Sequence, residues 1–131
     1  MEEAPGCRLA LHRNRGVAGL IRRPLRGEVY WVALDPVVGA EIRKTRPAVI
    51  VSNNSCNAFG ARVVVVPLTS NVDSCYPGEA LVRVKNKKAR ALGDEIRSID
   101  KARLRGKIGT LSREDLKGVD EAILITLNLE A

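Results

Sequence analysis

The chain has 131 residues, of which 45% are hydrophobic, and its formal net charge is +7 at pH 7. This length and apolar content predict one domain that buries a single core. No apolar run reaches the length of a membrane span, and three scattered cysteines without CxxC spacing, beside one histidine, speak against a zinc site and against a secreted disulfide framework. We therefore expect a cytoplasmic protein with reduced thiols.

The positive charge is spread unevenly along the chain. Residues 1–26 carry a net charge of +4, and residues 27–111 carry +6 from fourteen Lys and Arg against eight acids. Residues 112–131 carry −3. A basic body with an acidic end suggests a polyanion such as RNA held away from the C-terminal segment. Charge alone fits a protein with ordinary surface lysines equally well.

Residues 1–25 contain five arginines and only short apolar runs. The segment is too interrupted for a signal-peptide core and lacks the serines of a transit peptide. We expect a disordered basic extension, followed by one domain over residues 26–131. A nucleic-acid-binding arm is the alternative interpretation of this segment.

Three β-prone runs open the predicted domain. Residues 27–34 (GEVYWVAL) end at a proline turn, and residues 46–52 (RPAVIVS) carry Pro47 near the start, where a strand tolerates it. Residues 62–68 (RVVVVPL) are a continuous valine run, as expected of a strand buried on both faces. Short polar connections between these runs predict a meander or small barrel.

The second half of the chain predicts further strands and a helix. The loop 70–78 leads to a strand at 79–84, and a basic connection at 85–90 leads to strands at 94–99 and 107–111, separated by a turn at 100–104. Five or six short strands indicate a small barrel or sandwich. Ser112 with Asp115 resembles a capping box, and an apolar stripe with helical spacing follows at Leu116, Val119, Ile123 and Leu127. We expect this amphipathic helix to cover an open side of the barrel.

RNA cleavage without a metal ion needs a base for the 2′-hydroxyl, an acid for the leaving oxygen and donors for the phosphorane. The predicted domain has no histidine, so arginine, a hydroxyl and one carboxylate would have to suffice. Arg46 offers a planar fork for a phosphate, and Thr69 offers a hydroxyl for a non-bridging oxygen. Each also has an ordinary structural explanation, as a surface arginine or a threonine that satisfies local backbone.

Several motifs in order closely resemble the MazF/PemK family of toxin endoribonucleases. They are GEVYW (27–31), LDP (34–36), GAE (39–41), RPAVIVSN (46–53), PLTSN (67–71), IRSIDKARL (96–104) and VDEA (119–122). The resemblance covers residues 26–129, and separated motifs in one order are far more specific than a single short pattern.

The resemblance implies a mainly β, SH3-like barrel of five to seven strands with a C-terminal helix. It implies a homodimeric toxin of a type II toxin–antitoxin system, an mRNA interferase that inhibits growth by cutting single-stranded RNA at a short sequence. No metal or other cofactor takes part, and the products are a 2′,3′-cyclic phosphate and a 5′-hydroxyl. The implied partner is an antitoxin whose acidic, disordered tail blocks the groove. Operator DNA would be reached only through that antitoxin, and no membrane is involved.

By position, the resemblance gives catalytic roles to Arg46 and Thr69, and to Glu41 as base or orienter. The implied RNA-binding residues are Arg43, Lys44, Ser70, Asn71, Asp94, Glu95 and Arg97. Because strands 46–52 and 62–68 are expected to pair, Arg46 and Thr69 should share one end of the sheet.

Two other functions remain open from the sequence. A toxin on the same barrel could bind DNA gyrase and cut nothing, but it would not need Arg46 and Thr69 at a common phosphate. A non-catalytic RNA-binding barrel would keep a basic groove and would survive the loss of Thr69.

Overall fold

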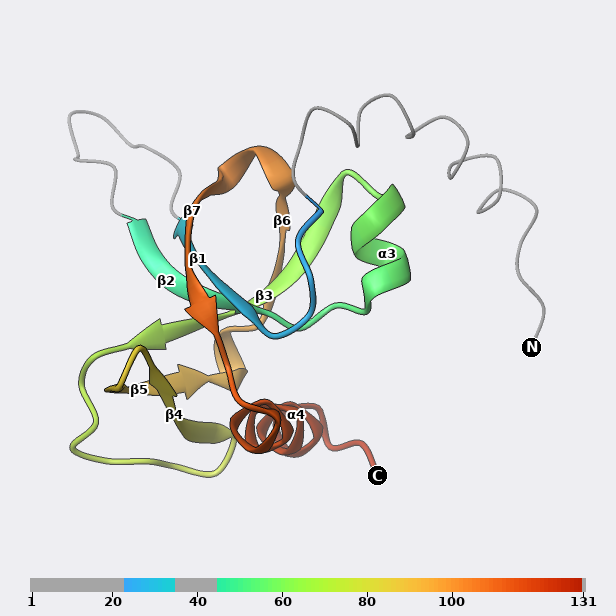
Figure 1. The fold of residues 1–131 in the computed structure, drawn as a ribbon. Helices are drawn as coiled ribbons and strands as arrows, with labels where there is room; N and C mark the ends of the chain where they lie inside the picture. The colour runs from blue at the N-terminus through green and yellow to red at the C-terminus, as the bar shows by residue number, and fades with distance from the viewer. Residues whose placement is uncertain (1–22, 35–44, 131) are drawn as a thin grey trace, which may run out of the picture.

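The computed structural model describes residues 23–34 and 45–130, and within them seven strands form one curled sheet with a helix beneath it (Figure 1). Two short 3₁₀ turns, Gly93–Glu95 and Lys101–Arg103, flank the sixth strand. The fold confirms the predicted mainly β architecture with a C-terminal helix. The elements are β1 (Glu28–Ala33), β2 (Thr45–Ile50), α3 (Asn54–Phe59), β3 (Arg62–Thr69), β4 (Glu79–Val84), β5 (Lys87–Leu92), β6 (Arg97–Asp100), β7 (Leu104–Thr110) and α4 (Arg113–Leu127).

Strand β3 is the centre of the sheet. The strand order is β4-β5-β3-β2-β1-β7, all pairs are antiparallel, and β6 also pairs with β3. On one edge β3 pairs with β2, which confirms the predicted meander of the first three strands. On the other edge it pairs first with β6, through Val65, and then with β5, from Leu68 onward. Pro67, which has no backbone N–H to donate to a neighbouring strand, lies where β3 changes from pairing with β6 to pairing with β5.

Alternate residues of the first three strands enter two different cores. On β3, Val63 and Val65 belong to a cluster inside the curl of the sheet, whereas Val66 and Leu68 belong to a cluster on its other face. Side chains in a strand point to opposite faces in turn, so a continuous valine run serves both clusters. The prediction that this strand is buried on both faces is confirmed.

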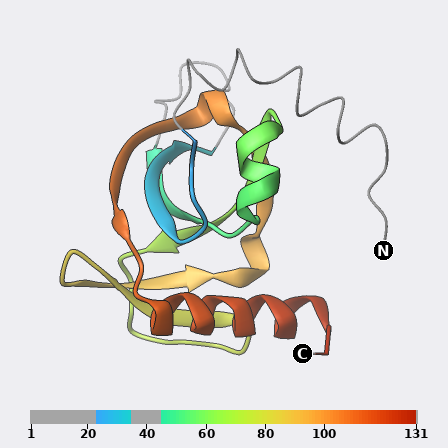
Figure 2. The ribbon, with the colours of Figure 1, turned by 45° about the vertical axis from the view of Figure 1, so that its right-hand side comes forward.

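Helix α4 closes the second cluster. Its Ser112 hydroxyl accepts the N–H of Asp115, as the capping pattern predicts, and Asn128 ends the helix in a left-handed conformation with φ 58°. Val119 and Ala122 are buried against the sheet, and Figure 2 shows the helix lying along β4. The predicted stripe is wrong at its end, because Leu127 is 48% exposed.

The secondary structure of three segments differs from the sequence prediction. The segment expected to be a basic connection at 85–90 contains most of β5, which forms a hairpin with β4. The strand expected at 94–99 starts as a 3₁₀ turn and becomes extended only at Arg97. A short helix, α3, was not expected at all. Its six residues are held by the side chain of Asn53, which accepts the N–H of Cys56.

Candidate functional site

Arg46 and Thr69 lie on neighbouring strands. The register of β2 and β3 pairs Ala48 with Pro67 and Ile50 with Val65. Continuing the same register by two residues places Arg46 opposite Thr69. Paired residues of an antiparallel sheet point to the same face, so both side chains can reach one ligand at this end of the sheet.

The guanidinium of Arg46 is accessible and keeps its donors available. Its side chain is 45% exposed, and its Nη1 lies 3.9 Å from Oε1 of Glu95. That separation is an ion pair and too long for a hydrogen bond. Within the described residues no hydrogen bond involves this guanidinium, so two of its N–H groups can bind two oxygens of one anion, such as a phosphate.

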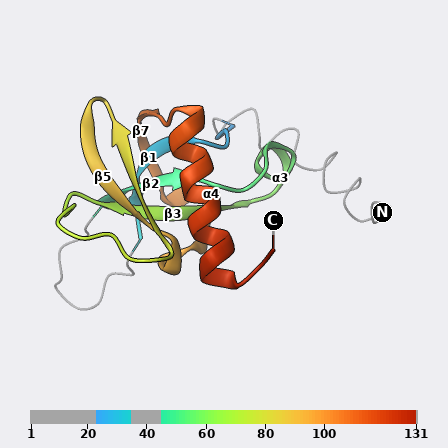
Figure 3. The same ribbon diagram turned by 90° about the horizontal axis from the view of Figure 1, so that it is seen from below.

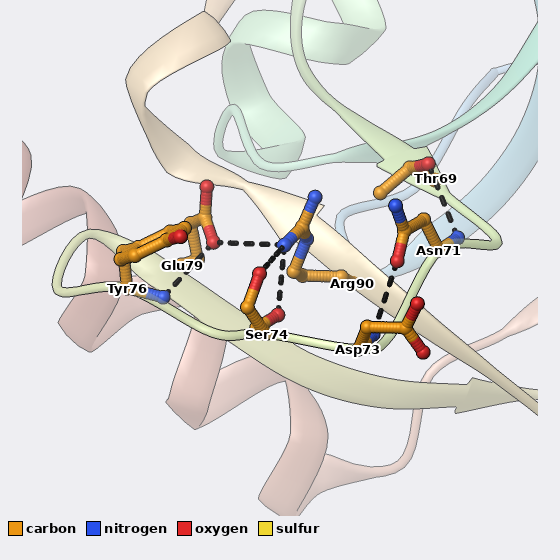
Figure 4. Close-up of polar contacts among 7 residues, drawn as sticks. All are labelled: Thr69, Asn71, Asp73, Ser74, Tyr76, Glu79 and Arg90. Carbon is orange, nitrogen blue, oxygen red and sulfur yellow. Dashed lines mark hydrogen bonds and ion pairs between the residues drawn. The ribbon is translucent and has the colours of Figure 1, made fainter.

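Thr69 ends β3 in a tight turn. Its Oγ1 accepts the N–H of Asn71 at 3.3 Å, and Oδ1 of Asn71 accepts the N–H of Asp73 at 3.0 Å (Figure 4). These contacts fix the hydroxyl as an acceptor on one side. Its own proton has no acceptor within the described residues, so it can be donated to a ligand.

On the far side of Thr69, strand β5 contributes Arg90, its register partner. Nη1 of Arg90 donates to the carbonyl and the hydroxyl of Ser74, at 2.7 and 2.9 Å, and lies 3.6 Å from Glu79. Glu79 in turn accepts the N–H of Tyr76. This largely buried pair holds the middle of the loop 70–78, at Ser74 and Tyr76, against β5 (Figure 4).

Sequence reasoning missed Arg90, because it lies in the run that was taken for a basic connection. The signal was the alternation of Arg90 with Ala89 and Ala91, which is typical of a strand with two small residues on one face and a charged side chain on the other. The Nε of Arg90 is buried without a hydrogen-bond partner. Because one of its donors has no partner, the largely buried Arg90 guanidinium relies on the nearby Glu79 carboxylate to stabilise its charge.

The other predicted site residues are placed as follows. Glu95 is brought to Arg46 by the 3₁₀ turn after β5. Asp94 and Arg97 are exposed on either side of Glu95, and no contact links them to Arg46 or Thr69. Ser70 is exposed next to Thr69. Glu41, Arg43 and Lys44 lie outside the described residues.

Two ionisable groups elsewhere have shifted pKa values. Burial raises the pKa of Glu28, but hydrogen bonds from Lys107, the Leu25 N–H and Tyr30 outweigh burial and hold that pKa below its usual value. Burial, with the charge of Arg23, lowers the pKa of Lys101. Neither group contacts Arg46 or Thr69. Within the described ranges, no three His, Cys, Asp or Glu side chains gather as metal ligands would.

Comparison with known proteins identifies the family. The profile of the family described as "PemK-like, MazF-like toxin of type II toxin-antitoxin system" matches residues 25–127, which include every described strand. This chain belongs to that family. As a MazF-like toxin it is 39% identical over 113 residues to Endoribonuclease MazF9 of Mycobacterium tuberculosis, an alignment that covers 79% of this chain and 96% of the relative.

Solved structures of MazF-like proteins share the fold. An endoribonuclease from a mycobacterial species superposes with a TM-score of 0.71 at 26% identity, over 85% of this chain and 97% of the other. An endoribonuclease in complex with its cognate antitoxin, also mycobacterial, gives 0.68 at 27% identity, over 85% and 99%. MazF from Deinococcus radiodurans gives 0.68 at 24% identity, over 81% and 97%, which supports the fold alone. In this MazF-like chain, no described helix is long and apolar enough to cross a membrane.

Proposed function

We propose that this MazF-like toxin is a sequence-specific endoribonuclease that cuts single-stranded RNA in the cytoplasm by means of Arg46 and Thr69. The observation that supports this most is the antiparallel register of β2 and β3, which, continued by two residues beyond the paired ones, would set Arg46 opposite Thr69. The family and the endoribonuclease names of its relatives agree with this activity. We propose that side chains alone carry out this chemistry, without a metal ion.

In the proposed reaction the 2′-oxygen of a ribose attacks the adjacent phosphorus, and the bond from phosphorus to the 5′-oxygen breaks. The 2′-hydroxyl proton leaves to a base, and the departing 5′-oxygen takes up a proton. The products are a 2′,3′-cyclic phosphate and a 5′-hydroxyl. Arg46 stabilises the extra negative charge of the phosphorane, and Thr69 donates its proton to a non-bridging oxygen.

The base remains a prediction. Glu41, the candidate from the sequence, lies outside the described residues. Glu95 is a carboxylate that the structure brings to within 3.9 Å of the Arg46 guanidinium, where it occupies the position of an anion. We therefore keep Glu41 as the proposed base and propose that Glu95 lies at the RNA site as an ion-pair partner of Arg46 that a phosphate displaces. Arg43, Lys44, Ser70, Asn71, Asp94 and Arg97 are proposed to contact the RNA.

We also propose that the toxin acts as a homodimer and that a cognate antitoxin inhibits it through an acidic, disordered tail. The strongly basic middle of the chain would attract such a tail, which would order on binding and cover the RNA site. The complex of a relative with its antitoxin supports this assignment. Full cleavage in the presence of a saturating antitoxin tail would contradict inhibition by occlusion.

The activity is tested with the purified protein and a long defined RNA in EDTA, with 5′ ends mapped by primer extension. We expect discrete cuts by the wild-type protein, and loss of those cuts in Arg46→Ala and Thr69→Ala. Two matched variants of exposed residues on β7, Arg105→Ala and Thr110→Ala, should cut normally. Intact RNA in the wild-type lane would favour a gyrase-binding or RNA-binding protein instead.

A further inference from the structure

The hairpin of β4 and β5 has four exposed basic side chains around its turn: Arg83, Lys85, Lys87 and Lys88. No acidic residue occurs between Glu79 and Asp94. Within the described part of the chain, none of the four side chains forms an ion pair or donates a hydrogen bond. We call these four side chains the basic hairpin.

This arrangement works against the stability of the hairpin. Arg83 and Lys88 lie directly opposite each other in the register, and like charges in that position repel. The turn residues Lys85 and Asn86 both adopt positive φ, of 52° and 68°, although neither is glycine. The stem of Lys85 lies over Gly109 of β7, which leaves its ammonium group in solvent. The four cations therefore lie close together at a cost to local stability, and the carboxylate of Asp115 on α4 accepts the backbone N–H of Arg83 at 2.9 Å.

The basic hairpin continues the candidate site along one strand. Arg90 on β5 is the register partner of Thr69, and Lys88 lies two residues further along the same strand, about 7 Å away. In Figures 1, 2 and 3 the hairpin and the end of β3 lie on the same side of the molecule. An extended polyanion that contacts Thr69 can therefore run on over the hairpin.

We propose that the basic hairpin binds backbone phosphates of the substrate RNA outside the scissile bond. This inference rests on the proposed ribonuclease function. Lysine binds a phosphate as a point charge without reading a base, so the contact would add affinity and leave the cut sequence unchanged. An acidic amphipathic peptide is a poorer fit, because Leu81 is the only large apolar side chain exposed between residues 79 and 92.

The test compares the wild-type protein with the triple variant Lys85→Gln, Lys87→Gln, Lys88→Gln on two RNAs that contain the same mapped cut site. One RNA carries about two flanking nucleotides on each side, and the other about ten. We expect KM for the long RNA to rise about tenfold at low salt, with kcat unchanged and the short RNA little affected. Binding of the long RNA is measured in the Thr69→Ala background at several salt concentrations. The slope of the logarithm of the binding constant against the logarithm of the salt concentration should become shallower by about 2.

The matched control is Arg23→Gln, Arg62→Gln, Arg105→Gln, which removes the same charge from exposed residues away from the hairpin. An equal effect of this control would overturn the proposal, since net charge alone would explain the loss. The proposal would also be overturned if the triple variant raised KM equally for both RNAs, or for neither of them.

Two further outcomes separate the alternatives. If the triple variant lost affinity for an oligo-glutamate peptide and kept its affinity for RNA, the hairpin would be a protein-docking site and the proposal would be wrong. If the wild-type protein bound the long RNA through the hairpin but never cut it, the proposed nuclease would fail and the phosphate contact would stand. Thermal unfolding checks the fold, and the triple variant should melt no lower than wild type, because it loses a like-charge pair.

Discussion

Two polar clusters of this small sheet have opposite properties. The Glu28 carboxylate, on β1, accepts hydrogen bonds from the Leu25 N–H at 2.8 Å, the Tyr30 hydroxyl at 2.9 Å and Lys107 Nζ at 2.8 Å, and the residue is 8% exposed. Arg46, on the neighbouring strand β2, is 45% exposed, and among the described residues its guanidinium pairs only with Glu95, at 3.9 Å. The first cluster is satisfied within the protein, and the second has donors left for a ligand.

This difference separates a structural role from a functional one. A buried charge stabilises the fold only when its hydrogen bonds are made, and Glu28 meets that condition. An exposed guanidinium with unused donors adds little to stability but is ready to bind an anion. Substitutions in the two clusters should therefore move different quantities, namely stability for Glu28 and RNA cleavage for Arg46.

The largest expected effect belongs to Arg46. Arg46→Ala should lower kcat by a hundredfold or more, about 3 kcal/mol of transition-state stabilisation. Arg46→Lys should recover only part of the loss, because an ammonium keeps the charge but not the fork. Single-turnover cleavage and urea unfolding measure the two quantities on the same samples. A large fall in the free energy of unfolding would instead show that Arg46 has a structural role.

Glu28→Gln should do the reverse. The variant leaves Lys107 without its counter-ion and weakens the hydrogen bonds of a buried carboxylate, so we expect a loss of about 2 kcal/mol in the free energy of unfolding. The kcat of the remaining folded protein should be unchanged. Glu121→Gln, an exposed substitution on α4, is the control and should be near neutral. Normal stability of Glu28→Gln would show that the polar cluster contributes nothing.

The pH dependence of stability sharpens the assignment. Because the pKa of Glu28 is lower in the folded protein than its ordinary value of 4.5, the unfolded chain binds more protons as the pH falls. Its contribution should be fully present above about pH 4.5 and lost as the pH falls through the lowered pKa of the folded state. Urea unfolding of wild type and Glu28→Gln from neutral to acidic pH measures the difference in their free energies of unfolding. This difference should narrow only below about pH 4.5. A difference that widened in acid would contradict the lowered pKa.

The smallest expected effect is at Glu95. Its carboxylate competes with a phosphate for Arg46, and the pair is about half exposed on both sides, so its strength is modest. Glu95→Gln should lower KM for RNA by up to about fivefold and leave kcat nearly unchanged. Competition binding with uncleaved RNA in the Thr69→Ala background measures the affinity directly. A large fall in kcat would instead make Glu95 part of the catalytic machinery.

The candidate site could be predicted only in part. Strong local patterns revealed β2 and β3, and their antiparallel register, continued by two residues, sets Arg46 opposite Thr69. Glu95 was expected near RNA, but its contact with Arg46 depends on the 3₁₀ turn that follows β5. Glu41 was predicted as the base, and it stays a prediction.

Local sequence accounts for the features that depend on near neighbours. These are the valine run that is buried on both faces, the cap of α4 at Ser112, and the order of motifs that places the chain in its family. The remaining contacts depend on how distant segments pack together. Glu28 meets Lys107, Arg90 meets Glu79, and the basic hairpin forms because distant segments pair, and a charged side chain's burial depends on partners that a local pattern does not contain.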